Sequence, residues 1–227
     1  MQGIDAIYHL AARMDYTDSY RQPARLCSAN VEGTTNLFCM ADRAGVNKVI
    51  FTSSAAVYGN IIPAKETDSK VPINMYGATK SAAEEICRGF YQKGFEVIIL
   101  RLFNIWGRKN SNSVINKFVN CHNVIYGDGK QTRDFVFVDD LLLALGHALN
   151  WDSGIYNIGS GEETTIEAIH AMLKDEEPKY KDFEAGWNDI FRSCADTSYT
   201  EQATGWKAKT LISELNREEI IRLCNLT

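Results

Sequence analysis

The stretch KVIFTSS, residues 48–54, predicts a β-strand buried on both faces, because its β-branched and aromatic residues run on without polar alternation. Two similar apolar stretches lie before and after it, DAIYHLAA at residues 5–12 and EVIILRL at residues 96–102. Continuous apolar strands are typical of parallel sheets, whose two faces are both covered by helices. The three stretches therefore predict the core of one parallel sheet.

Helical periodicity fills the gaps between these strands. Apolar residues recur at three- and four-residue spacing over about residues 26–44 and again over about residues 76–93. Gly45 and Gly94 follow the two segments, and glycine is the residue that most often ends a helix. The order strand, helix, strand, helix, strand predicts an α/β fold with a parallel sheet flanked by helices.

The pattern is less regular after residue 104. Residues 174–183 are rich in charge and predict a surface loop. The other elements expected here are a helix at about 113–120, an extended run at 134–138, a helix capped by Asp139 or Asp140 and ending near 149, a strand at 154–159, a helix at 165–173 and a terminal helix at 210–223. The strand at 154–159 is expected to join the parallel sheet.

Composition excludes several classes of protein. The chain has 227 residues and a net charge of −5, which disfavours nucleic acid as a partner. No apolar run approaches the roughly 20 residues that span a bilayer, so we expect no membrane partner. The N-terminus MQGIDAIYHLAA lacks the basic leader of a signal peptide, and we therefore expect a cytoplasmic protein.

The cysteines and histidines do not predict a metal site. None of the six cysteines forms a C-x-x-C pair, and the four histidines share no spacing typical of zinc ligands. A chain of this length with so few cysteines is not a disulfide scaffold. We therefore expect reduced thiols, most of them buried, and no bound metal.

The sequence MYGATK, residues 75–80, places Tyr76 four residues before Lys80, so both side chains lie on one face of the predicted helix. An ammonium beside a phenol favours the phenolate and lowers the pKa of the tyrosine toward neutrality. The spacing alone is a weak signal, because a solvated helix start explains it better. The same spacing recurs at Tyr126 and Lys130, where two glycines predict a turn instead.

Two further polar stretches stand where predicted strands end. TSSAAVYG, residues 52–59, leaves one strand, and RLFNIWG, residues 101–107, leaves the next. Parallel sheets of α/β proteins bind their ligands at the carboxyl ends of the strands. Together with Tyr76 and Lys80, these stretches predict a single cleft at that edge.

The motifs of the whole chain carry a resemblance to a known family. They are HLAA at 9–12, NVEGT at 30–34, SSAAVYG at 53–59, YGATK at 76–80, RLFN at 101–104, GDGKQTRDF at 127–135 and YNIG at 156–159. As an ordered set they resemble the extended short-chain dehydrogenase/reductase family, in its nucleotide-sugar epimerase/dehydratase branch. The resemblance covers nearly the whole chain.

This resemblance implies NAD as the cofactor and a UDP-sugar or other nucleotide-sugar as the substrate. It makes Tyr76 the catalytic acid and base, with Lys80 lowering its pKa and contacting the nicotinamide ribose, and Ser54 contacting the sugar 4-hydroxyl. The implied cofactor contacts are Ala11, Ala12, Asn30, Thr52, Tyr76 and Lys80. The implied substrate contacts are Ser54, Asn104 and Arg133, the last two holding the diphosphate.

The residues after Ser54 favour one reaction within the branch. Related dehydratases and several decarboxylases have an acidic residue there, whereas this chain has Ala55 and Ala56. Eliminating water needs an acid–base pair that alanines do not supply, and a 4-epimerase needs none. The resemblance therefore favours a UDP-glucose 4-epimerase-like enzyme. A dehydratase, decarboxylase or reductase is the disfavoured alternative, and a non-catalytic nucleotide-sugar-binding protein is another.

The family pattern also predicts a segment that this sequence lacks. About 60–70 residues with a glycine-rich turn for the pyrophosphate ordinarily precede a strand like residues 5–10, and no G-x-G-x-x-G occurs here. We therefore expect an N-terminally truncated Rossmann-like sheet, activity reduced or lost in this chain alone, and an exposed strand edge. Pairing with another chain, as in a homodimer, is one way to cover such an edge.

The resemblance also divides the chain into two parts. Residues 1–107, joined by 133–160, are expected to form the partial dinucleotide-binding core. Residues 108–132 and 161–227 are expected to form a small substrate-binding region. One arginine of the family pattern is missing from the stretch EAGWND at 184–189, and Arg192 is the candidate to replace it.

Overall fold

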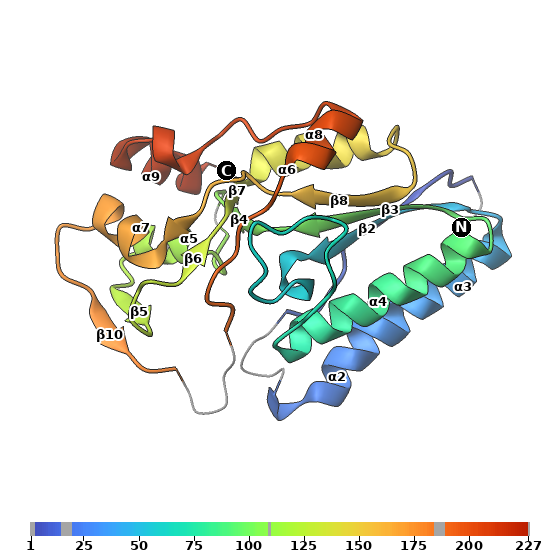
Figure 1. The fold of residues 1–227 in the computed structure, drawn as a ribbon, viewed down its shortest axis with the longest axis horizontal. Helices are drawn as coiled ribbons and strands as arrows, with labels where there is room; N and C mark the ends of the chain where they lie inside the picture. Colours follow the sequence, from blue (N-terminus) through green and yellow to red (C-terminus); the bar gives the residue numbers. More distant parts are fainter. Residues whose placement is uncertain (1–2, 15–19, 109, 184–188, 227) are drawn as a thin grey trace. The chain divides into compact units, whose positions relative to one another are not determined.

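The three predicted apolar strands form one sheet in the computed structural model, which describes residues 3–14, 20–108, 110–183 and 189–226 (Figure 1). Strands β1 (Ile7–His9), β2 (Lys48–Ser54) and β3 (Glu96–Leu102) are parallel neighbours, with Ile7 opposite Val49 and Lys48 opposite Glu96. Strand β8 (Gly154–Ile158) follows β3 in the sheet order β1-β2-β3-β8. The α/β fold is confirmed.

The position of β1 bears on the expected exposed edge. Among the described strands, β1 pairs with β2 alone and ends the sheet on that side. Its Tyr8 and the flanking Ile4 and Leu10 are exposed. The described part of the chain therefore presents the open, partly apolar strand edge that was predicted.

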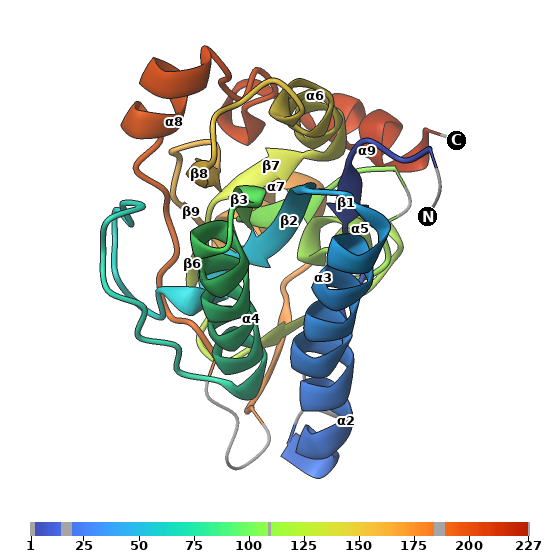
Figure 2. The ribbon, with the colours of Figure 1, turned by 90° about the vertical axis from the view of Figure 1, so that its right-hand side faces the viewer.

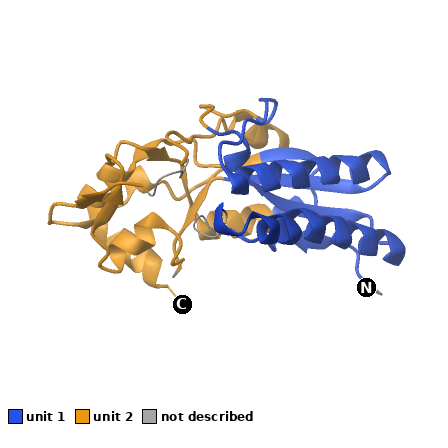
Figure 3. Ribbon diagram, turned by 90° about the horizontal axis from the view of Figure 1, so that it is seen from below, with its two compact units in different colours: residues 1–59, 66–102, 146–156 blue, residues 60–65, 103–145, 157–227 orange. Residues whose placement is uncertain are grey.

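Contacts divide the chain into two compact units, coloured separately in Figure 3. Unit 1 comprises Met1–Gly59, Glu66–Leu102 and Gly146–Tyr156. Unit 2 comprises Asn60–Lys65, Phe103–Leu145 and Asn157–Thr227. Most of the segment 133–160 falls in unit 2 rather than with residues 1–107, so the division by function stays a prediction.

The helices of unit 1 begin and end close to where the pattern predicts. α2 (Pro23–Cys27) continues through a π-helical turn, η1 (Ser28–Glu32), into α3 (Gly33–Ala44). Gly45 ends α3 in the left-handed conformation, with φ at 74°. α4 spans Met75–Gln92. The π turn was not predicted, because the apolar spacing of this segment is that of a continuous helix.

Aromatic side chains join these helices to the sheet. α3 and α4 run side by side, as Figure 2 shows, and the rings of Phe38 and Phe90 stack with centroids 4.7 Å apart. Phe95 contacts Phe90 edge to face at 5.3 Å. Phe38 and Phe95 belong to one apolar cluster, drawn mainly from both helices and from β2 and β3, against which Phe90 packs. Its buried residues are Phe38, Ala41, Val46, Val49, Phe51, Ala83, Cys87, Phe95, Val97 and Ile99. This packing covers one face of the sheet.

Unit 2 is built from shorter elements around its own core. β4 pairs with β7 and β5 with β10, both in parallel, whereas β6 pairs with β9 in antiparallel fashion. The elements are β4 (Asn104–Trp106), α5 (Val114–Val119), β5 (Val124–Tyr126), β6 (Thr132–Arg133), β7 (Phe135–Phe137), α6 (Val138–Ala148, its last three residues in unit 1), β9 (Thr164–Thr165), α7 (Ile166–Leu173), β10 (Lys179–Lys181), α8 (Ser198–Thr204), η3 (Ile212–Glu214) and α9 (Arg217–Asn225).

Two predictions in unit 2 were wrong, and one helix was missed. The expected loop at 174–183 contains β10, which forms because β5 offers it a partner. α8 was not predicted at all. The terminal helix begins at Arg217 rather than near 210, because the side chain of Asn216 caps it in a capping box with Glu219.

The expected cap of α6 was also wrong. Asp139 and Asp140 lie within the first turn of α6 rather than before it. The Asp140 carboxylate accepts hydrogen bonds from the backbone N–H groups of Lys209 and Thr210, at 3.2 and 2.9 Å. Asp140 therefore holds the segment that precedes α9, a contact that joins residues about 70 positions apart.

Fewer cysteines are buried than predicted. All six are free thiols, but only three are buried; those exposed are Cys27, Cys39 and Cys121. Within the described ranges, no group of histidine, cysteine or acidic side chains is arranged to hold a metal ion. No described helix combines the length and apolar character needed to cross a membrane.

Asp134 organises the backbone of unit 2. Its carboxylate is fully buried and accepts hydrogen bonds from the N–H groups of Ser160, Gly161 and Ala195 at 2.6, 3.0 and 3.1 Å, as well as from the Ser160 hydroxyl at 2.7 Å. Burial raises the pKa of this carboxyl, and the four donors oppose that rise. One side chain thus ties the start of β7 to the turn after β8 and to the segment before α8.

We predict that Asp134→Ala lowers the free energy of unfolding by about 3 kcal/mol or more, because three backbone N–H groups, that of Ala195 buried, lose their acceptor. Asp128→Ala is the matched control, since Asp128 accepts one bond, from Lys130 N–H, in an exposed turn. Its effect should stay below about 1 kcal/mol. Denaturant unfolding measures both changes, and equal effects would contradict the assignment.

Candidate active site

The turn after β2 and the start of α4 are in direct contact in unit 1. Gly77 makes this approach, since a Cβ at this position would lie 2.4 Å from the carbonyl oxygen of Ala56. Asn74 caps α4 by accepting a hydrogen bond from Gly77 N–H at 2.8 Å. The contact brings the residue before that turn, Ser54, close to the first turn of α4, which carries Tyr76.

Ser54 begins a short 3-10 turn, η2 (Ala55–Val57). Its hydroxyl accepts a hydrogen bond from Ala56 N–H at 3.2 Å and remains partly exposed. The side chains of Ala55 and Ala56 are buried, 7% and 4% exposed. At this turn the chain therefore presents one polar side chain, the Ser54 hydroxyl, followed by two buried methyl groups.

Tyr76 and Lys80 are both buried, with 8% and 3% of their surfaces exposed. They lie one turn apart on the face of α4 that is directed toward the sheet. The alternative of a solvated helix start is therefore wrong. The pair has the spacing and the burial that a proton-transfer device requires.

Lys80 is held by β2. Its Nζ donates a hydrogen bond to the carbonyl oxygen of Thr52 at 2.6 Å and lies 4.7 Å from the centre of the Phe51 ring. Burial lowers the pKa of Lys80 to about 8, while the neighbouring Cys87 and Glu84 raise it. At neutral pH the amine is therefore mostly charged, and an ammonium near a phenol favours the phenolate.

Asn30 lies at the centre of the π turn and is almost fully buried. Its amide oxygen accepts a hydrogen bond from Arg13 N–H at 2.7 Å, and its amide nitrogen donates to the Arg13 carbonyl and to the Thr79 hydroxyl, both at 3.0 Å. Thr79 in turn donates to the carbonyl of Tyr76 at 2.8 Å. Asn30 thus joins the segment after β1 to α4, and its predicted contact with the cofactor stays a prediction.

The segment after β1 borders a hollow in unit 1. Ala11 and Ala12 are exposed on it. The residues lining the hollow are His9, Ala11, Ala12, Arg13, Ala29, Gly33 and Leu37. Thr52 fixes the strand beside it, because its hydroxyl donates to the His9 carbonyl at 3.2 Å. Small side chains here leave room for a ligand to approach the backbone.

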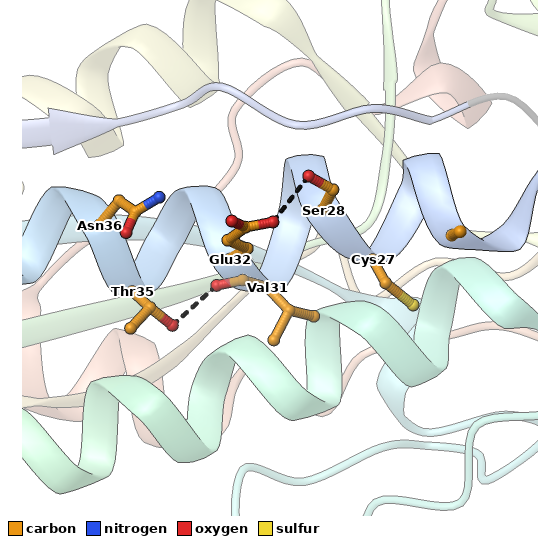
Figure 4. A pocket seen from close by; sticks show the side chains of 7 residues that line it. Cys27, Ser28, Val31, Glu32, Thr35 and Asn36 are labelled. Carbon is orange, nitrogen blue, oxygen red and sulfur yellow. Dashed lines mark hydrogen bonds between the residues drawn. The ribbon is translucent and has the colours of Figure 1, made fainter.

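A second hollow, shown in Figure 4, lies along α2, η1 and α3. It is lined by Ala24, Cys27, Ser28, Val31, Glu32, Thr35 and Asn36. Ser28 donates to Glu32 at 2.8 Å, and Thr35 donates to the Val31 carbonyl at 2.9 Å, so these hydroxyls are used within the helix. None of the predicted site residues lines this hollow.

The predicted substrate contacts Asn104 and Arg133 lie in unit 2. Asn104 is exposed in β4, and its N–H donates to the Asp134 carbonyl at 2.9 Å, next to Arg133. The Arg133 guanidinium donates to the carboxylate of Asp189 at 2.8 Å and to the Thr132 carbonyl at 2.7 Å. The two residues are thus neighbours, and their contact with a diphosphate stays a prediction.

Arg192, the candidate replacement for the missing family arginine, is engaged elsewhere in unit 2. Its guanidinium donates two hydrogen bonds to Glu163, at 2.7 and 2.6 Å. The family position that it would replace falls in residues 184–188, which lie outside the described part.

Sequence reasoning missed an ion pair beside the predicted site. Glu84 and Arg101, each 2% exposed, are joined by two hydrogen bonds, at 2.9 and 2.8 Å. Two signals were available. Glu84 continues the four-residue spacing of Tyr76 and Lys80, and Arg101 is a charged residue inside an otherwise apolar strand. Charges at such positions are buried only when paired.

Comparison with known proteins identifies the family. The profile of the NAD dependent epimerase/dehydratase family matches residues 1–159. A putative UDP-glucose 4-epimerase of Methanocaldococcus jannaschii is 33% identical over 229 residues, covering 93% of this chain and 74% of that protein. UDP-glucuronic acid decarboxylase 1 of Arabidopsis thaliana is 31% identical over 233 residues, covering 93% of this chain and 53% of that protein. The chain belongs to the NAD dependent epimerase/dehydratase family.

Solved structures agree with this assignment. The UDP-glucose 4-epimerase of Thermotoga maritima, solved with UDP-glucose, superposes with a TM-score of 0.86 at 30% identity, over 97% of this chain and 75% of that one. MoeE5, solved with UDP-glucuronic acid and NAD, gives a TM-score of 0.87 at 29% identity, over 97% and 80%. The family, the fold and NAD as its cofactor are thereby confirmed, while the relatives catalyse more than one reaction.

We predict that Gly77→Ala destabilises the chain by about 1–3 kcal/mol, although alanine is the better helix former, because its Cβ would overlap the backbone of Ala56. Gly89→Ala in the same helix is the control. A Cβ there has no neighbour within 4 Å, and it should stabilise by about 0.5–1 kcal/mol. Unfolding in urea measures both, and effects of the same sign would contradict the packing of α4 on the turn.

Proposed function

We propose that this chain carries the catalytic residues of a nucleotide-sugar 4-epimerase of the UDP-glucose 4-epimerase type, which uses NAD. The observation that supports it most is the buried pair of Tyr76 and Lys80, with the amine anchored to β2 by a 2.6 Å hydrogen bond. Both side chains occupy the face of α4 that packs toward the end of β2. No solvated surface pair would need such an anchor.

The side chains of this pair suit proton transfer at the sugar 4-hydroxyl. In its phenolate form, Tyr76 removes the hydroxyl proton, and the resulting phenol later returns it to the 4-keto oxygen. Lys80 favours the phenolate through its positive charge. Ser54, whose hydroxyl lies at the turn facing the start of α4, holds the same sugar oxygen by a hydrogen bond.

The residues present fit the nicotinamide end of NAD. The small side chains of Ala11 and Ala12 border an open hollow, and the buried Lys80 amine is bound to the Thr52 carbonyl of β2. When bound there, NAD would supply a reversible hydride acceptor for the sugar. Ala11, Ala12, Asn30, Thr52, Tyr76 and Lys80 would hold it; Asn104 and Arg133 would hold the diphosphate of the UDP-sugar.

The residues after Ser54 support epimerisation over the other reactions of the family. Ala55 and Ala56 are buried and offer only methyl groups, so the turn has no acid or base beyond Ser54. Elimination of water needs such a group, whereas a 4-epimerase needs proton transfer at one oxygen only. Decarboxylation is the second candidate, because a UDP-glucuronic acid decarboxylase is among the relatives at 31% identity.

We predict that Tyr76→Phe lowers the rate of interconversion of UDP-glucose and UDP-galactose by about 100-fold or more, since the transferred proton loses its carrier. Binding of UDP-glucose, measured by calorimetry, should change by less than about threefold, because the phenyl ring is kept. Tyr91→Phe is the control: Tyr91 lies on the same helix but is 55% exposed, and its variant should match the unmodified chain.

The outcomes separate the candidate functions. Unchanged turnover in Tyr76→Phe would overturn the assignment of the catalytic acid and base. Release of CO2 from UDP-glucuronic acid, without epimerisation, would favour the decarboxylase. Binding of a UDP-sugar by a chain that neither binds NAD nor turns over either substrate would favour the non-catalytic alternative.

A further inference from the structure

The buried face of α4 carries one continuous row of ionisable side chains. Tyr76, Lys80 and Glu84 follow each other at four-residue spacing, and Cys87 comes three residues later. Their exposed fractions are 8%, 3%, 2% and 0%. Lys80 therefore has the proposed proton carrier one turn before it and a buried carboxylate one turn after it.

The Glu84 carboxylate is bound by two neighbouring strands. Arg101 of β3 donates from Nε to Oε1 at 2.9 Å and from Nη2 to Oε2 at 2.8 Å. Ser53 of β2 donates from its hydroxyl to Oε1 at 2.5 Å. Ser53 and Arg101 are direct partners in the β2–β3 register. A second cation, Lys70, has its Nζ 3.4 Å from Oε2. The carboxylate thus fixes one turn of α4 to a single point of the sheet.

Strand β2 therefore holds α4 through two consecutive residues. Thr52 binds Lys80 through its carbonyl, and Ser53 binds Glu84 through its hydroxyl. Helix side chains one turn apart are matched to adjacent residues of the strand, so a shift of the helix along the sheet would break both contacts. The position of the Lys80 amine depends on the anchor one turn away.

Arg101 makes further contacts within unit 1. Its guanidinium lies 4.7 Å from the centre of the Tyr58 ring, and its Nη1 donates to the Glu66 carbonyl at 3.2 Å. A buried ion pair is often no more stabilising than apolar side chains of equal volume. Stability alone therefore does not account for placing two charges here.

The charges that surround Lys80 make Glu84 important to it. The ionisable groups facing the amine are Glu84 and Cys87 on α4 and His9 at the end of β1, with Tyr76 one turn away. Burial lowers the pKa of Lys80, and the thiol and the carboxylate oppose this effect. Burial lowers the pKa of His9, and the positive charge of Lys80 lowers it further. Arg101 binds the Glu84 carboxylate through two hydrogen bonds.

We propose that Glu84 is a positioning residue for the proposed proton-transfer pair: held by Arg101 and Ser53, it fixes Lys80 against β2 and places a carboxylate one helical turn from its amine. The proposal rests on the role given to Lys80 in the proposed function. Glu84 itself touches neither sugar nor cofactor in this scheme, and it acts through Lys80 alone.

The test is a titration of Lys80 that needs neither cofactor nor substrate. NMR spectra of the chain with 13C-labelled lysine follow its Cε signal, assigned by its absence in Lys80→Arg. In Glu84→Gln we expect the midpoint to fall by about one unit from its starting value near 8, because a neighbouring negative charge is lost. In Arg101→Met we expect it to rise, since a nearby positive charge is lost and the carboxylate remains.

Shifts of the Lys80 midpoint in opposite directions in the two variants distinguish a positioning role from a purely structural one. If Glu84 and Arg101 only stabilised the fold, both variants would loosen α4, admit water and move the midpoint upward, toward the value of a solvated lysine. A rise in Glu84→Gln therefore overturns the proposal, and so does an unchanged midpoint. Glu85→Gln is the matched control: Glu85 is the adjacent carboxylate, half exposed, and its variant should leave the midpoint unchanged.

A conservative variant covers the case in which Glu84→Gln does not fold. Glu84→Asp keeps the charge but draws it back by one methylene, so the midpoint should fall by a smaller amount, and an unchanged midpoint again overturns the proposal. This result is independent of the proposed function. Normal turnover by Tyr76→Phe would overturn the epimerase mechanism even if Lys80 and Glu84 are coupled, and an uncoupled Lys80 would leave the Tyr76 test intact.

Discussion

Charged groups that face a protein interior need fixed partners, because water no longer solvates them. In unit 1 this constraint acts where α4 packs on the sheet. Lys80 finds its partner in the carbonyl of Thr52, and Glu84 finds its partners in Ser53 and Arg101. Apolar burial has no preferred direction, whereas these groups have one arrangement in which all are hydrogen-bonded. The helix is thereby placed relative to β2, and the start of α4 is placed with it.

Much of the fold was predictable because its signals are local. Apolar runs, spacing and terminating glycines indicate the strands β2 and β3 and the helix α4. The observed bounds of both strands equal the predicted ones, and those of α4 differ by one residue at each end. β10 was missed because a three-residue charged strand exists only through pairing with β5. The π turn Ser28–Glu32 was missed because its apolar pattern is that of an ordinary helix.

The site shows the same division. Tyr76 and Lys80 were predictable, since their spacing and their place after an apolar strand are visible in the sequence. Glu84 and Arg101 each had a signal in the sequence, but that they pair with each other was not predictable, because they lie 17 positions apart on different elements. The hydrogen bonds of Asn30 to Arg13 and Thr79 were not predictable either, because they depend on the π turn, which directs the Asn30 side chain inward. The sequence motifs therefore indicated the candidate catalytic residues, whereas the residues that hold them in place were visible only in the packed structure.

The π turn has a consequence for how the length of this segment can vary. Each residue added to or removed from a helix rotates the turns before it by about 100° relative to the turns after it. The turn Ser28–Glu32 accommodates its extra width while Asn30 faces inward and α3 keeps Phe38 in the core. A single-residue deletion there would restore regular helix geometry and turn α2 away from its present orientation. Substitutions along the outer face of α2 and η1 are thus far better tolerated than any change in the number of residues.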